Sequence, residues 1–172
     1  IGTFLLCLAA FLYVGLLVRL LMRAEGLHLV RRHAFSAGAF LFIAASLGFL
    51  MVLDWAEIIT LDIPEPGIYH GGLAIYGFMG LLVFGFSRIM VPMLSISDKL
   101  NDKLALITLT LSICALFLWT LSFFILACVI GIVAASLHIY EMLNVLKARF
   151  RSRLGPEWLV IRFGWFMLPA SL

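Results

Sequence analysis

The chain has 172 residues, of which 65% are hydrophobic and only 12% are charged, and its mean hydropathy is +1.18. The core of a soluble domain of this length could not absorb so much apolar surface, so the composition excludes a soluble globular protein and indicates an integral membrane protein. The net charge of +3 does not indicate nucleic-acid binding, because basic residues of a membrane protein collect beside its spans.

Two apolar stretches at the start of the chain predict the first two membrane spans, over residues 1–22 and 34–53. The segment between them contains several arginines and has the composition of a short basic loop. His28 and His33 lie in this loop. We therefore expect both side chains to be solvated.

An acidic loop, residues 54–67, follows the second span and holds four carboxylates and no basic residue. Its two prolines prevent a continuous helix, so the chain is expected to leave the membrane here. A third span is expected over residues 70–93, closed by a Val-Pro pair. From His70 to Val91 the only charge is Arg88, and these residues at about 1.5 Å each cover about 33 Å, enough to cross a hydrocarbon core of about 30 Å.

Four residues of this third helix are predicted to share one face, because each residue of an α-helix is rotated by about 100° from the one before it. They are His70, Gly77, Phe84 and Arg88, so the face carries a histidine, a position without a side chain, an aromatic ring and a cation. The glycine would let another helix or a flat ligand approach the backbone closely. Arg88 is most simply interpreted as a basic anchor that snorkels to the inner surface. The alternative, that it contacts a ligand bound at His70, is disfavoured because about 27 Å of helix separate the two residues.

An uncharged run over residues 104–140 follows the next polar loop. One helix of that length would measure roughly 55 Å, nearly twice the hydrocarbon thickness, so the run has to reverse once. We expect the reversal near residues 119–122, which gives spans over residues 104–120 and 123–146. Residues 158–172 resemble the start of a sixth span, so we expect the recorded sequence to be a piece of a longer chain.

The expected architecture is an all-α, polytopic transmembrane helix bundle that forms one membrane domain over residues 1–172, with five full spans and the start of a sixth. With alternating spans, all 12 Lys and Arg residues fall on one side, which is expected to be the cytoplasmic side. The N-terminus of the recorded chain and His70 then lie toward the outside. A bacterial inner membrane is the expected location. The expected partners are the lipid bilayer and either other membrane subunits or the remainder of the chain.

The third span also resembles a helix of a known family. Residues 68–94, IYHGGLAIYGFMGLLVFGFSRIMVPML, begin with a histidine near the outer face, continue through glycines and aromatic residues, and end in Val-Pro-Met-Leu. This pattern resembles the second helix of subunit I of the haem-copper oxidases. The sequence that follows, SISDKLNDKLALITLTLS, resembles that family's next loop and helix, and the NnrS-type haem and copper proteins are similar in the same way.

The resemblance implies a non-covalent, b-type haem. In the family the matching histidine is an axial ligand of the low-spin haem iron, so His70 would be the iron ligand here. The implied function is electron transfer or chemistry on O2 or NO. Oxidoreductase activity and bound copper are also properties of the family, but its copper ligands and second haem ligand lie on later helices. The resemblance therefore leaves the reaction and the copper site open.

His138 and Glu141 form a second candidate site in the fifth span. They are three residues apart and so share one helix face, with Asn144 one turn further on. An ionisable pair within a span is costly without a partner, so the pair is interpreted as an interfacial structural contact, a proton- or ion-handling site, or half of a metal site. Its expected depth near the inner face makes His138 unsuitable as the second axial ligand of iron at His70.

Two other functions fit the same residues. One is a haem-free ion or small-molecule transporter subunit, with His138 and Glu141 on its ion pathway, and the other is a purely structural membrane subunit. The sequence has no Gly-rich phosphate loop, nucleophile elbow or Cys-x-x-Cys-His motif. Their absence argues against nucleotide binding, hydrolase chemistry and covalent c-type haem.

Overall fold

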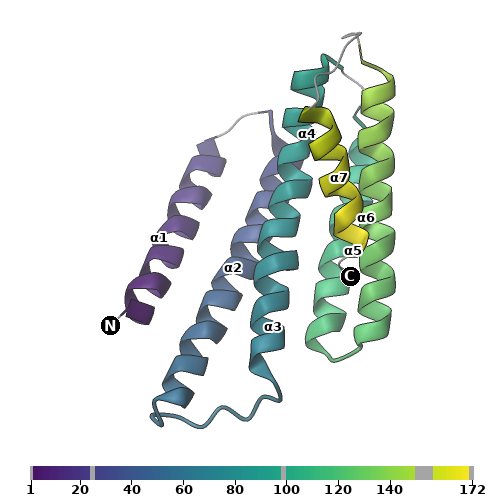
Figure 1. Ribbon diagram of the computed structural model, residues 1–172. Helices are drawn as coiled ribbons and strands as arrows, with labels where there is room; N and C mark the ends of the chain where they lie inside the picture. Colours follow the sequence, from purple (N-terminus) through teal and green to yellow (C-terminus); the bar gives the residue numbers. More distant parts are fainter. Residues whose placement is uncertain (1, 24–25, 98–99, 150–156, 171–172) are drawn as a thin grey trace. The chain divides into compact units, whose positions relative to one another are not determined.

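The computed structural model describes residues 2–23, 26–97, 100–149 and 157–170, and these residues form helices and turns without a β-strand. Figure 1 shows the helices in chain order: α1 (Gly2–Arg23), α2 (His28–Trp55), α3 (Pro66–Gly72), η1 (Leu73–Gly80), α4 (Leu81–Ser95), α5 (Asp102–Thr120), α6 (Phe124–Lys147) and α7 (Glu157–Ala170). The segments α3, η1 and α4 follow one another as a single long helix. Five helices within these described ranges are long and apolar enough to cross a membrane, which confirms the predicted all-α class and is compatible with an integral membrane protein.

The helix α2 begins at His28, ahead of the predicted start at residue 34. The basic segment expected as a loop therefore forms the first turns of this helix. His33 is buried, with 1% of its surface exposed, and its Nδ1 donates to the main-chain oxygen of Leu29 at 2.9 Å. The prediction that His33 is solvated was wrong, whereas His28 is exposed as expected. A helix satisfies its own main-chain hydrogen bonds, so polar residues can extend it beyond the apolar stretch.

The helix α4 continues to Ser95, so the prediction that the Val-Pro pair closes it was wrong. Pro92 lacks an N–H and removes one main-chain hydrogen bond, but near the C-terminus of a helix this disturbs a single turn. The Ser95 hydroxyl donates to the main-chain oxygen of Val91 at 2.6 Å, within the same turn. The helix therefore tolerates the proline.

The chain divides into two compact units, residues 1–82 and 83–172. In the first unit α2 packs against α1 and against the α3–η1 segment (Figure 1). Phe11 of α1 and Phe42 of α2 bring their ring centroids to 4.9 Å. Cys7 of α1 is buried, but most of the large apolar side chains of this helix are exposed. So extensive an apolar surface is stable in contact with lipid or with another apolar surface.

In the second unit α5 and α6 form an antiparallel hairpin (Figure 1). The predicted reversal at residues 119–122 is confirmed, because α5 ends at Thr120 and α6 begins at Phe124. Small residues let membrane helices approach closely. The small residues buried in this hairpin are Ala105, Thr108, Ala115, Ala127, Ala134 and Ala135. The helix α7 packs on α6, where Trp158 and Trp165 join the buried core of the unit.

Candidate functional site

The imidazole of His70, the residue to which the resemblance assigns iron ligation, lies against α2. His70 follows the first turn of α3, which begins at Pro66. Its Nδ1 is 2.9 Å from the main-chain oxygen of Ala44. One turn further along α2, a Cβ atom at Gly48 would lie 2.8 Å from Cε1 of the ring, closer than real side-chain contacts allow. The ring occupies this position because residue 48 has no side chain.

The hydrogen bond to Ala44 fixes which nitrogen of His70 carries the proton. A main-chain carbonyl can only accept, so Nδ1 is the donor. In the neutral imidazole Nε2 then has the free lone pair. Within the described part of the chain, Nε2 has no hydrogen-bond partner. Metal-ligating histidines typically have this arrangement, with one ring nitrogen donating to a carbonyl and the other facing the metal.

The long helix that carries His70 changes its winding shortly after this residue. Residues Leu73–Gly80 form the π-helical segment η1, and π-helical turns are frequent at functional sites. A Cβ atom at Gly77 of this segment would lie 2.8 Å from Cβ of Phe40 in α2. The two contacts are reciprocal, since a ring from each helix rests on a glycine of the other. The glycines allow the close approach that positions the imidazole.

The four residues of the predicted face divide between the two units, and each pair contacts a helix of its own unit. His70 and Gly77 contact α2, whereas Phe84 and Arg88 contact α6. Hydrogen bonds in a π-helix run from residue i to i+5, so its turns hold more residues than α-helical turns. A spacing of about 100° per residue therefore does not hold across η1.

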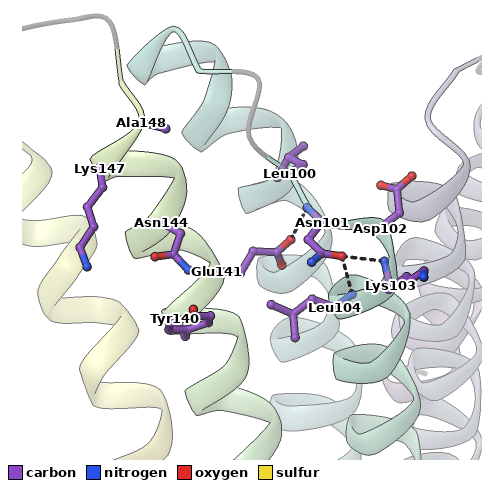
Figure 2. A pocket seen from close by; sticks show the side chains of 10 residues that line it. All are labelled: Leu100, Asn101, Asp102, Lys103, Leu104, Tyr140, Glu141, Asn144, Lys147 and Ala148. Atoms are coloured by element: carbon purple, nitrogen blue, oxygen red, sulfur yellow. Dashed lines mark hydrogen bonds between the residues drawn. The ribbon is translucent and has the colours of Figure 1, made fainter.

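The second unit contains a pocket of about 820 Å³ between the start of α5 and the last turns of α6. Figure 2 shows Glu141 reaching from α6 toward Asn101, with Lys103 on the α5 side and Lys147 on the α6 side of the pocket. The full lining is Leu100, Asn101, Asp102, Lys103, Leu104, Tyr140, Glu141, Asn144, Lys147 and Ala148.

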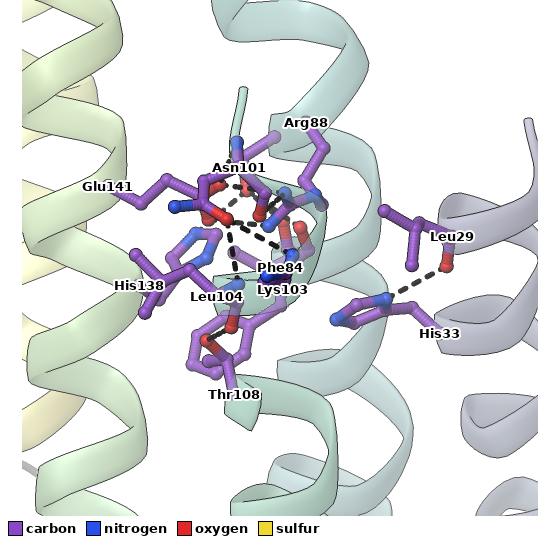
Figure 3. A network of polar contacts seen from close by, with 12 residues as sticks. Leu29, His33, Phe84, Arg88, Asn101, Lys103, Leu104, Thr108, His138 and Glu141 are labelled. Carbon is purple, nitrogen blue, oxygen red and sulfur yellow. Dashed lines mark hydrogen bonds and ion pairs between the residues drawn. The ribbon is translucent and has the colours of Figure 1, made fainter. Parts of the chain in front are cut away.

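A buried ion pair joins α4 to α6 at this pocket (Figure 3). Arg88 donates from Nη1 to Oε2 of Glu141 at 2.5 Å and from Nη2 to Oε1 at 2.7 Å. The residues are 4% and 2% exposed. The interpretation of Arg88 as a snorkelling anchor was wrong, because its guanidinium is buried against a carboxylate. A bidentate pair of this kind has defined geometry as well as complementary charge.

Asn101 completes the network and was missed by the sequence analysis. Its main-chain N–H donates to Oε1 of Glu141 at 3.0 Å, and its main-chain oxygen accepts from Nη2 of Arg88 at 3.1 Å. Its side chain accepts from the N–H groups of Lys103 and Leu104 and so caps α5. An asparagine directly before an apolar helical run is a capping signal, but nothing in the sequence connects it to a residue 40 positions further on.

His138 contacts Ser87, the neighbour of Arg88, and the sequence analysis also missed this serine. The Nε2 atom is 3.0 Å from Oγ of Ser87, and the ring stacks on Phe84 with centroids 4.2 Å apart. Oγ also makes a short contact with the main-chain oxygen of Val83. The single hydroxyl proton serves that carbonyl, so Nε2 of His138 is the donor toward Ser87.

His138 and Glu141 therefore share a face as predicted, and both contact α4. Both are buried within the protein, at 1% and 2% exposed. Both carboxylate oxygens of Glu141 have donors, and its charge is balanced by Arg88. The arrangement is well suited to hold helices together.

No group of three or more His, Cys, Asp or Glu side chains that could hold a metal ion occurs among the described residues. Haem iron is different, because the porphyrin supplies the equatorial ligands and the protein adds only axial ones. Comparison of the chain with protein-family models, curated proteins and solved structures finds no match. The function is therefore inferred from the side chains described above.

Proposed function

We propose that this protein binds haem within the membrane, with His70 as one axial ligand of the iron. The observation that carries the proposal is the hydrogen bond from Nδ1 to Ala44, because it leaves the Nε2 lone pair of a neutral imidazole free. The resemblance of residues 68–94 to the second helix of haem-copper oxidase subunit I supports the same role for the same residue.

The groups around His70 prepare the imidazole for this role. The Ala44 carbonyl orients the ring, as carbonyls behind metal-bound histidines do. Gly48 leaves room for the ring, and Gly77 brings η1 close to α2. A bound b-type haem would supply one-electron transfer or the binding of O2 or NO. No step is assigned to copper, because the described residues offer no ligand group for it.

The absorption spectrum of purified, haem-supplied protein tests the proposal. We expect a Soret band that sharpens and shifts on reduction with dithionite, and we expect His70→Ala to remove or convert the low-spin spectrum. Two control variants should keep it: His138→Ala, whose ring is bound to Ser87, and His28→Ala, whose side chain is exposed. A wild-type protein without bound haem, or an unaltered spectrum in His70→Ala, contradicts the proposal.

The proposed setting is a bacterial inner membrane, with the N-terminus of the recorded chain outside and further membrane subunits or the rest of the chain as neighbours. The distribution of Lys and Arg supports this orientation. Single cysteines at His28 and Thr60, both exposed, test it in a background without Cys7, Cys114 and Cys128. An impermeant thiol reagent should label the Thr60 position in intact cells and the His28 position only after permeabilisation. Labelling of both positions in intact cells would refute the orientation.

Transport of ions or small molecules is the second candidate function, supported by the buried charges of the second unit. Ionisable groups inside membrane spans are expensive and often mark ion or proton pathways. In this alternative His138 and Glu141 exchange protons while Arg88 balances the carboxylate. Proteoliposomes containing a pH-sensitive dye should then show proton flux that Glu141→Gln abolishes. Equal flux in the variant and in wild-type protein would leave the cluster a structural one.

A further inference from the structure

The pocket at the start of α5 and the end of α6 has no role in the proposed haem binding, and the transport alternative uses only Glu141 of its lining. Its volume of about 820 Å³ is within the usual range of small-molecule sites. The α5–α6 hairpin brings its two walls together, because α5 begins where α6 ends. The pocket therefore belongs entirely to the second unit.

The charges of the pocket favour an anion. Lys103 and Lys147 line the pocket from α5 and α6, and both are exposed. Their side chains extend away from one another in Figure 2, so a ligand between them is contacted when the long flexible stems turn inward. Of the two carboxylates in the lining, Glu141 is held by Arg88 and by the N–H of Asn101, so its charge is already balanced. With Asp102 as the remaining carboxylate, the two lysines leave one positive charge in excess.

The uncharged part of the lining suits an amphipathic ligand. Asn144 and Tyr140 offer hydrogen-bonding side chains beside the lysines (Figure 2). Leu100 is 39% exposed, and Leu104 adds a second apolar side chain on the α5 wall. A ligand with a phosphate group and an alkyl portion could use both parts of the pocket.

We infer that this pocket binds the phosphate-bearing head group of an anionic phospholipid, with Lys103 and Lys147 as its cationic contacts. Basic pockets between membrane helices on the cytoplasmic side are known to bind such head groups. In the proposed orientation this end of the hairpin faces the cytoplasm, where anionic lipids and the positive residues of the chain meet. The inference depends on that orientation and is independent of haem binding.

Native mass spectrometry of the full-length protein in detergent, titrated with phosphatidylglycerol, tests the inference. Wild-type protein should retain one phosphatidylglycerol, and Lys103→Gln/Lys147→Gln should bind it about 30-fold more weakly. Both lysines are exposed, so the double variant should fold normally. Arg19→Gln/Arg23→Gln is the matched control, because it removes the same charge from exposed positions of α1 and should leave the affinity unchanged.

Two further titrations identify the source of the phosphate group. Zwitterionic phosphatidylcholine should bind at least tenfold more weakly than phosphatidylglycerol, since it lacks the net negative charge that the lysines recognise. Millimolar inorganic phosphate should not displace the lipid. Equal binding of the two lipids, equal binding by the double-lysine variant, or displacement by inorganic phosphate would overturn the inference, the last by assigning the pocket to a free anion.

Discussion

The two units hold their central histidines in opposite ways. His70 is half-buried, is bound to α2 by one main-chain hydrogen bond and keeps Nε2 free of partners among the described residues. His138 is buried, stacks on Phe84 and uses Nε2 for a hydrogen bond to Ser87. The comparison shows why a histidine within a span is not by itself a ligand site. What distinguishes the two rings is their surroundings: the ring of His138 is buried and stacked on Phe84, whereas the ring of His70 is half-buried and its Nε2 has no hydrogen-bond partner among the described residues.

The same contrast applies to charge. The first unit positions its histidine with glycines and a carbonyl, and no ionised group among its described residues takes part. The second unit buries a carboxylate and a guanidinium, and each ion is stable there only because the other is present. Disrupting the ion pair should therefore cost more stability than any change around His70.

The largest effect is expected from breaking the ion pair. Arg88→Met or Glu141→Met leaves one buried charge without its partner, so each single variant should lose about 3–5 kcal/mol of unfolding free energy. Unfolding in mixed micelles, followed by circular dichroism, measures the loss. The double variant Arg88→Met/Glu141→Met should recover most of it, because no unpaired charge remains. If the single variants were as stable as wild-type protein, the buried pair could not be what joins α4 to α6.

A smaller loss of unfolding free energy is expected from adding a methyl group at Gly48, where the ring of His70 contacts α2. In Gly48→Ala the new Cβ would lie 2.8 Å from Cε1 of the ring, so the imidazole has to move at a cost of about 1–3 kcal/mol. The same displacement should weaken haem binding, which a haem titration followed at the Soret band measures. Gly15→Ala is the matched control, because no atom lies within 4 Å of its Cβ position. Unchanged haem affinity in Gly48→Ala would show that haem binding does not depend on the position of the His70 ring.

The smallest effect on stability is expected from removing His70 itself. His70→Ala deletes one hydrogen bond of a half-buried ring and should cost about 1 kcal/mol in haem-free protein. His138→Ala should cost more, because its ring is buried and stacked as well as hydrogen-bonded. Mixed-micelle unfolding of the two variants side by side gives the comparison. The reverse order would mean that His70 has a structural role larger than its contacts indicate.

Several features of the fold and sites could be predicted from the sequence because they depend on distance along one chain. The five apolar helices follow from the rise per residue and the thickness of the bilayer, and the reversal near Thr120 follows because a longer run could not fit. The shared face of His138 and Glu141 follows from a spacing of three within one α-helix. These are local properties, so they need no knowledge of neighbouring helices.

The hydrogen-bond partners of the site residues depend on the tertiary structure alone. Arg88 meets Glu141 across 53 positions, and His70 meets Ala44 across 26, and no local pattern indicates either pairing. The π-helical winding of η1 also changed the register that a uniform α-helix predicts. Composition determines that a helix crosses the membrane, because the bilayer responds to apolar length. Which nitrogen remains free, and which charge is balanced, depends on the helices that pack beside it.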